Sequence, residues 1–304
     1  MPLTAPPSGS RIAAADIAQN TLRNRAMIVE LHLSMWGGKR LDREATRRMI
    51  RHAGAADDAG NFVKHLVPKE ALDPVQSAHR AARDRHNDLT LPWGEGSRIL
   101  AATGWFAYTQ AMAEERAKVE KIHRKFCTED YPELLLSAPE RLTGGMYKPA
   151  DYPSPAAIAN RFGFKLVVMP LPHHDDFRLN LGADVETAIR SEIEATIISR
   201  QADAQRDLWT RLLATVQHFA STMAEEGKRF QKTTVTNLTE IANLAPKLAL
   251  HPDPVLEEIC AEIRAITERC DAESLRASKM VRARAAEEAH AALRRIESAL
   301  EGAF

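Results

Sequence analysis

The sequence is poor in cysteine, and this shortage argues against two classes of protein. The 304-residue chain has three cysteines, Cys127, Cys260 and Cys270, and no two of them form a CxxC pair. Disulfide-stapled domains and cysteine-rich zinc sites need more cysteines at closer spacing. An odd number of scattered cysteines is instead typical of a protein that works in a reducing cytoplasm.

Membrane and secretion signals are also missing from the sequence. No uninterrupted apolar stretch approaches the roughly 18 residues that a membrane-spanning helix needs. The N-terminal sequence MPLTAPPSGSRIAAADIAQN contains no basic stretch followed by an apolar core, so we expect no secretory signal. The sequence therefore predicts a soluble, cytoplasmic protein without a membrane partner.

Net charge is absent as well, because 41 lysines and arginines balance 41 aspartates and glutamates. A neutral chain gives no general reason to expect a nucleic-acid partner. Only a local excess of positive charge could indicate one. The first 100 residues hold 15 basic against 11 acidic side chains, and residues 183–304 hold 16 against 20. The chain is therefore mildly basic at the front and mildly acidic at the back.

The hydrophobic pattern predicts an α+β protein that is mostly helical. Residues 1–10 are rich in proline and serine and are expected to form a disordered N-terminus. Residues 11–182 are interpreted as a small mixed α/β head with β-hairpins. Residues 183–304 are interpreted as a long antiparallel helical hairpin of the coiled-coil type.

The sequence predicts the bounds of one strand and one helix of the head. In residues 26–35 apolar side chains largely alternate with a second, mostly polar set. This two-residue period is that of a half-buried strand. Gly37 and Gly38 predict a tight hairpin turn, and the return strand would begin at the following residues KRLD. The next helix is expected to be capped by Asp42 and to end near Gly54.

The rest of the head is expected to contain further strands and helices joined by a connector rich in proline and glycine. The predicted strands are residues 61–68, 97–103, 163–172 and 176–182, of which the last two form a hairpin. The predicted helices are residues 73–88 and 104–126, and the connector is residues 131–155.

Two helical segments dominate the predicted hairpin. Apolar side chains in residues 183–229 and 254–301 recur at alternating threes and fours, and each segment would form a helix of about 70 Å. We expect the two helices to be antiparallel and to mediate self-association, and pairing within one chain or between chains stays open. The middle of the second helix is rich in alanine, which favours either close approach to another chain or a well-solvated tip.

The stretch SMWGGKRLD resembles a phosphate-binding loop but lacks its defining residues. With Gly38 and Lys39 as the GK pair of a Walker A loop, the first glycine should stand where Leu33 stands. The hydroxyl side chain that ligates magnesium is replaced by Arg40. The stretch is therefore interpreted as a turn, and nucleotide hydrolysis is not expected.

One local cluster offers metal-capable side chains. It consists of His173, His174, Asp175 and Asp176. Neighbouring residues on an extended loop cannot all reach one ion, so a polar hairpin tip is the favoured interpretation and these residues are weak metal candidates. The other histidines are scattered, and no catalytic triad can be assembled from the sequence. We therefore predict no catalytic residue and no cofactor.

The strongest functional pattern is basic and aromatic. Arg43, Arg47 and Arg51 have i, i+4 spacing and would form a stripe along one helix face. Such a stripe can neutralise phosphates while an exposed tryptophan stacks on a base. The alternative is an ordinary solvated helix face, since Asp42 and Glu44 partly offset the positive charge. The candidate nucleic-acid-binding residues are Trp36, Lys39, Arg40, Arg43, Arg47 and Arg51.

Three motifs occur in a fixed order: LHLSMWGGKRLD, LPWGEGSRIL, and RFGFKLVVMPLP with DDFRLNLG, followed by a long helical segment. In this order the chain resembles, over most of its length, an uncharacterised family of bacteriophage and integrative-element proteins, a domain of unknown function. Members of such families are often encoded near a MoxR-type AAA+ ATPase and a von Willebrand A-domain protein. The resemblance implies a bacterial host cell and an AAA+ ATPase or another protein as partner, and it assigns no functional residues.

These observations support three hypotheses about function. The first is a non-enzymatic phage or mobile-element protein that oligomerises or docks partners through its helical coiled coil, with a head that binds nucleic acid, for which DNA is a candidate, or another protein. The second is a metal-dependent nuclease or phosphodiesterase that uses Asp175, Asp176 and histidines, which would need further acidic ligands from other strands. The third is a protein-binding inhibitor of a host defence system. We take the first hypothesis as the prediction from sequence.

Overall fold

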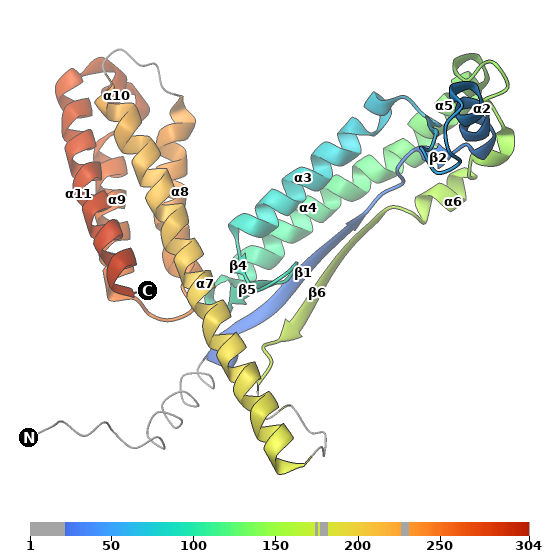
Figure 1. Ribbon diagram of the computed structural model, residues 1–304. Coiled ribbons are helices and arrows are strands. Elements are labelled where there is room, and N and C mark those ends of the chain that lie inside the picture. The colour runs from blue at the N-terminus through green and yellow to red at the C-terminus, as the bar shows by residue number, and fades with distance from the viewer. Residues whose placement is uncertain (1–21, 174–175, 177–181, 226–230, 304) are drawn as a thin grey trace, which may run out of the picture. The chain divides into compact units, whose positions relative to one another are not determined.

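The computed structural model of the protein describes residues 22–173, 176, 182–225 and 231–303. It confirms the predicted fold class, because the chain is mostly helical and contains a small four-stranded sheet and a long helical hairpin (Figure 1). No helix in the described part of the chain is both long enough and apolar enough to cross a membrane.

The chain divides into two compact units, each with its own core of buried apolar side chains. Unit 1 comprises residues Met1–Glu30, Asn87–Tyr108 and Val168–Phe304, and unit 2 comprises Leu31–His86 and Thr109–Val167. Several short segments of the predicted head therefore belong to the same unit as the helical hairpin.

The sheet contains four strands in the order β4-β5-β1-β6. The strands are β1 (Ala26–Ser34), β4 (Leu91–Pro92), β5 (Arg98–Ala101) and β6 (Gly163–Pro170). Strand β1 is antiparallel to β5, with Ala26 opposite Ala101, and β5 is antiparallel to β4. The predicted strands at 97–103 and 163–172 are thus present as β5 and β6. Most of the predicted strand 176–182 lies outside the described residues.

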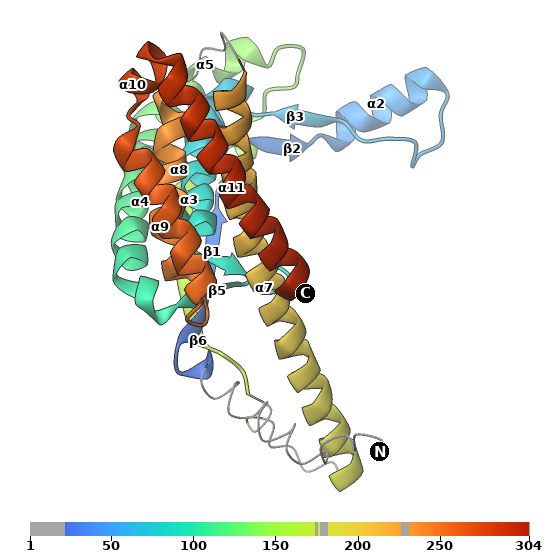
Figure 2. The same ribbon diagram turned by 90° about the vertical axis from the view of Figure 1, so that its left-hand side faces the viewer.

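In the described part of unit 1, five helices follow the sheet. Figures 1 and 2 show them from two sides. They are α7 (Ala183–Ala224), α8 (Lys232–Leu248), α9 (Pro254–Arg269), α10 (Ala272–Ala277) and α11 (Lys279–Ala303). Helix α7 packs against α11 and α8, and α9 packs against α8 and α11, so the four longer helices form a bundle. The predicted helical hairpin is therefore formed within one chain, by α7 and α11.

The buried seam of the bundle explains this packing. In α7 the apolar side chains of Leu212, Val216 and Phe219 recur at threes and fours, and each is at most 1% exposed. Helix α11 meets α7 with alanines, of which Ala285 and Ala289 are fully buried. Small side chains let two helices approach closely. The alanine-rich segment is therefore part of the core of this chain and is not a solvated tip.

The second arm of the hairpin is interrupted, in contrast to the predicted continuous helix. After α9, Asp271 caps α10 by accepting a hydrogen bond from the backbone N–H of Ser274 at 2.7 Å. Ser278 then caps α11 by accepting one from the backbone N–H of Val281 at 3.3 Å. Aspartate and serine are strong helix-starting residues, and here they divide residues 254–301 into three helices.

Unit 2 contains helices and a pair of short strands. Its elements are α2 (Arg43–Ala53), α3 (Asp73–Asp88), α4 (Trp105–Lys125), α5 (Tyr131–Arg141), α6 (Pro155–Ala159), β2 (Lys39–Leu41) and β3 (Val63–His65). Helices α3 and α4 begin or end in unit 1 and confirm the predicted helices at 73–88 and 104–126. The predicted connector 131–155 is wrong over its first part, which forms α5.

The predicted hairpin between β1 and the residues KRLD is also wrong. Strand β2 pairs with β3, so that Lys39 lies opposite His65 (Figure 2). Gly38 explains the difference, because its φ is +63° and a Cβ at this position would lie 2.9 Å from Val67 Cγ2. Its carbonyl accepts a hydrogen bond from the backbone N–H of Leu66 at 2.8 Å. The chain after Gly38 therefore runs beside the segment that contains β3.

Candidate nucleic-acid interface

Helix α2 has the predicted arginine stripe, and its N-terminus is fixed by a side chain. Asp42 accepts hydrogen bonds from the backbone N–H groups of Glu44 at 3.1 Å and Ala45 at 3.0 Å. The side chains of Ala45 and Ile50 are buried, so the helix exposes its other face. This face presents Arg43, Arg47 and Arg51 to solvent.

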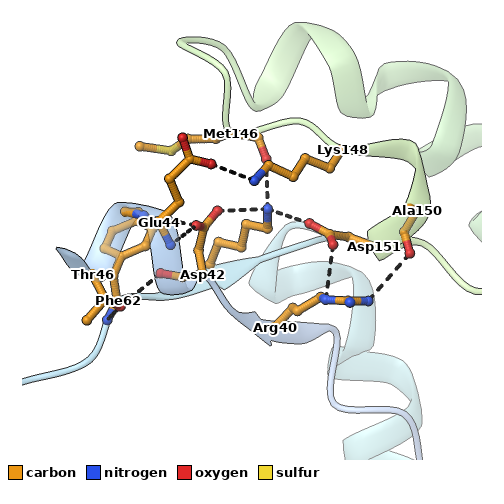
Figure 3. Close-up of polar contacts among 11 residues, drawn as sticks. Arg40, Asp42, Glu44, Thr46, Phe62, Met146, Lys148, Ala150 and Asp151 are labelled. Atoms are coloured by element: carbon orange, nitrogen blue, oxygen red, sulfur yellow. Dashed lines mark hydrogen bonds and ion pairs between the residues drawn. The ribbon is translucent and has the colours of Figure 1, made fainter. Parts of the chain in front are cut away.

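A buried lysine, Lys64, connects Asp42 at the start of α2 to Asp151 in a later segment of unit 2. Both carboxylates are labelled in Figure 3. Lys64 Nζ lies 3.0 Å from Asp42 Oδ2 and 2.5 Å from Asp151 Oδ2. It also donates to the backbone carbonyl of Met146 at 2.8 Å. The Lys64 side chain is 2% exposed, and the two carboxylates are nearly as well buried. Since an ammonium group has three hydrogens, its three acceptors satisfy it fully and leave none for a ligand.

The hydrogen bonds of this network keep its groups charged. The pKa of Asp42 is lowered to about 2, first because the Ala45 N–H donates to the carboxylate and second because Lys64 does. Burial opposes charge on Lys64, but its hydrogen bonds with Asp151 and Asp42 outweigh this effect and raise the pKa of Lys64. At neutral pH the network therefore contains a positive ammonium group bonded to the negative Asp42.

Two further ion pairs lie at the exposed edge of the network (Figure 3). Arg40 Nε lies 3.0 Å from Asp151 Oδ1, and the same guanidinium donates to the carbonyl of Ala150 at 3.5 Å. Lys148 Nζ lies 2.8 Å from Glu44 Oε2. The Arg40 and Lys148 side chains are 53% and 45% exposed. Lys148 and Glu44 are both exposed and an exposed ion pair is weak, so Lys148 can exchange its carboxylate for another anion, whereas Arg40 is held by the buried Asp151.

The side chains of the buried network and of the two ion pairs line a groove with a volume of about 720 Å³. Arg43 and Arg47 of α2 line the groove together with Arg40 and Lys148. Among the described residues, neither Arg43, Arg47 nor Arg51 has an ion-pair partner. A guanidinium group without a carboxylate partner is available to form charge-assisted hydrogen bonds to a phosphate. The groove therefore has the chemistry of a phosphate-binding surface.

The charge balance of unit 2 agrees with this chemistry. Basic side chains outnumber acidic ones by 20 to 15 in unit 2, although the whole chain is neutral. Within α2 the ratio of basic to acidic side chains is higher, because four arginines accompany a single glutamate. A cationic patch on an otherwise neutral protein is typical of a surface that binds nucleic acid.

The structure brings together three of the six predicted nucleic-acid-binding residues. Arg40, Arg43 and Arg47 line the groove, whereas Lys39 and Arg51 are exposed but do not line it. Besides the buried Lys64, sequence reasoning missed an exposed cation of the groove, Lys148. This residue lies 104 positions from its partner Glu44, and nothing in its own sequence neighbourhood marks it.

The predicted exposure of Trp36 is wrong. Its side chain is 4% exposed and lies in the core of unit 2. The ring centroid is 5.3 Å from that of Tyr131 in an edge-on arrangement and 6.5 Å from that of Phe126. Aromatic rings in such arrangements gain both burial and a favourable quadrupole interaction. Trp36 therefore stabilises the fold of unit 2 and cannot stack on a base.

The weak metal candidates do not form a site in the part of the chain that the structure describes. His173 is buried, and its backbone N–H donates to Asp176 at 2.9 Å. Asp176 also pairs with Arg23 at 3.1 Å. His174 and Asp175 lie outside the described residues. No group of three histidine, cysteine, aspartate or glutamate side chains able to hold a metal ion occurs among the described residues.

Comparison with known proteins gives no match, because no family model, no curated protein and no solved structure is similar to this chain. The resemblance to a family of phage and integrative-element proteins therefore stays a prediction. Function has to be inferred from the groove of unit 2 and the residues that line it.

Proposed function

We propose that the protein is a non-enzymatic nucleic-acid-binding protein of a phage or mobile element, and that unit 2 contacts the phosphate backbone through α2 and its groove. The observation that carries this proposal is the exposed row of Arg43, Arg47 and Arg51. These arginines have no ion-pair partner among the described residues, and two of them line the groove. Arginine neutralises phosphates and displaces their counterions, which is the main source of affinity in sequence-independent binding.

The buried ion network supports the proposal because it fixes the backbone beneath the cationic side chains. Lys64 joins Asp42 at the start of α2 to Asp151, and Asp151 in turn holds Arg40. A phosphate that enters the groove therefore meets groups on elements that are already in place. Less conformational freedom is lost on binding to such a surface than to a mobile loop.

The bundle of unit 1 is the proposed docking surface for a protein partner, for which an AAA+ ATPase is the predicted candidate. The apolar seams of α7 and α11 are buried within the bundle. A protein partner, or a second copy of this chain, would therefore contact the outer surface of the bundle. Self-association through these helices stays a prediction that light scattering can test.

Charge reversal on α2 tests the proposed nucleic-acid contact. We expect Arg43→Glu/Arg47→Glu to weaken binding to labelled DNA by about 10- to 100-fold, because two attractive contacts become repulsive. The slope of log affinity against log salt concentration should become shallower by about two. Fluorescence anisotropy at a low and a moderate salt concentration measures both quantities.

A matched variant in the same unit controls for net charge. Lys121 and Arg124 are exposed on α4, and Lys121→Glu/Arg124→Glu changes the charge of unit 2 by the same amount. We expect this variant to bind within about threefold of the wild type. Equal losses in the two double variants would show that net charge, and not α2, determines binding. Absence of binding by the wild type at low salt would exclude the proposal.

A further inference from the structure

We infer that the nucleic acid bound at this groove is a duplex, contacted along its phosphate backbone, in preference to a single strand. This inference rests on the proposed function and adds the class of nucleic acid. It depends on which side chains unit 2 exposes and which it buries.

Unit 2 lacks an exposed aromatic platform. Residues 31–86 and 109–167 are all described, and every tryptophan, tyrosine and phenylalanine side chain among them is buried or half-buried. Trp36 is packed in the core, and the rings of Tyr147 and Tyr152 lie against each other at a centroid distance of 5.7 Å. Stacking on an aromatic ring strengthens single-strand binding by roughly tenfold per base. Unit 2 therefore has no exposed ring to provide this gain in full.

The groove instead offers cations, which favour the nucleic acid of higher charge density. Helix α2 has 11 residues and is therefore about 16 Å long. Over that length a duplex presents a phosphate about every 1.7 Å of its axis, counting both strands. Each neutralised phosphate releases about 0.9 counterions from a duplex but about 0.7 from a single strand. With equal contacts, Arg43, Arg47 and Arg51 therefore bind the duplex more tightly.

The carboxylates that line the groove do not prevent such binding, and one of them regulates it. Asp42 and Asp151 are buried, and both are paired with Lys64. Glu44 is 67% exposed and is paired with Lys148. A phosphate that binds Lys148 lies next to Glu44, so this carboxylate repels the DNA backbone and competes with it for the same ammonium group.

Removal of this competitor should strengthen binding. We expect Glu44→Gln to raise the affinity for duplex DNA by about two- to fivefold and to steepen the salt dependence by close to one. Glu115→Gln is the matched control, because Glu115 pairs with Lys118 on α4 at 2.6 Å and does not line the groove. Unchanged or weaker binding by Glu44→Gln would contradict the competition, and an equal gain in Glu115→Gln would assign the effect to net charge.

The class of nucleic acid is tested with the full-length protein and two labelled probes. These are a duplex of about 20 base pairs and the single strand of the same sequence, titrated at about 50 and 200 mM salt. We expect the duplex to bind at least about tenfold more tightly at the lower salt concentration, and we expect Arg43→Glu/Arg47→Glu to lose most of this binding. Tighter or equal binding of the single strand would overturn the inference while leaving the proposed function intact. Failure of both probes to bind at the lower salt concentration would overturn the proposed function itself.

Discussion

Replacement of Lys64 by methionine is expected to lower the free energy of unfolding of unit 2 by about 3 to 5 kcal/mol. Methionine fills nearly the same volume but removes the only cation that contacts both Asp42 and Asp151 among the described residues. The two carboxylates would then be buried with too little compensating charge, and Asp42 would retain only the N–H donors of α2. Leaving a buried charge without its partner is among the most destabilising single changes.

Hydrogen exchange of peptides from unit 2, combined with urea unfolding, measures this loss. Lys148→Met is the matched control, because it also removes a lysine from the groove but breaks the exposed pair with Glu44. We expect the control to lose much less stability than Lys64→Met, because an exposed ion pair contributes little to folding. Lys64→Met/Asp151→Asn also removes one of the two carboxylates that lose contact with Lys64, and part of the stability should return. A Lys64→Met protein as stable as the control would disprove the structural role of the network.

Long periodic segments of this fold can be predicted from sequence alone. Helix α7 buries one face over much of its 42 residues, so apolar side chains recur at threes and fours many times. Strands β2 and β3 have three residues each and carry no comparable pattern. Their pairing depends on Gly38, whose close contact with Val67 is a tertiary interaction. A local glycine pattern predicts a turn but does not identify the strand that follows it.

Some features of the candidate site follow from the local sequence, whereas others depend on tertiary contacts. The arginine stripe of α2 could be predicted, because i, i+4 spacing places side chains on one face of any helix. The burial of Lys64 could not, because lysine is almost never fully buried without a partner, and here Asp42 lies 22 residues away. Trp36 stands near basic residues in the sequence, but its burial is determined by contact with Tyr131. Sequence patterns thus identify exposed charged side chains better than they identify the buried side chains that hold them in place.

A buried histidine pair joins α3 and α4 in unit 2. His79 Nε2 and His123 Nε2 lie 2.7 Å apart, and the Phe162 ring centroid is 4.8 Å from that of His123. One imidazole has to donate and the other to accept, so at least one ring must be neutral. Burial, followed by the charge of His79, lowers the pKa of His123 to about 4. Burial and the nearby Arg83 lower the pKa of His79 as well.

We expect the stability of unit 2 to fall as the pH is lowered from 6.5 toward 4. The unfolded chain binds a proton on each histidine near pH 6.5, whereas the folded chain protonates His123 only near its pKa of about 4. Within this window the unfolded state holds more protons, and acidification therefore favours unfolding. Between pH 7.5 and pH 4.5 the loss from His123 is about 2 to 3 kcal/mol, and His79 acts in the same direction. Urea unfolding at a series of pH values measures this dependence.

The contribution of the pair is isolated by the difference between two pH profiles. His79→Leu/His123→Leu removes both titrating rings together, so no buried nitrogen of the pair is left without its partner. The pKa of His251 in unit 1 is also lowered, by burial and then by Arg25, but its effect is common to both proteins and cancels. We expect the double variant to lose less stability than the wild type on acidification, whatever its stability at pH 7.5. Parallel profiles would show that the pair is not the source of acid sensitivity. The exposed His52→Gln variant should follow the wild-type profile, because this side chain lies on the surface of α2 and outside the buried pair.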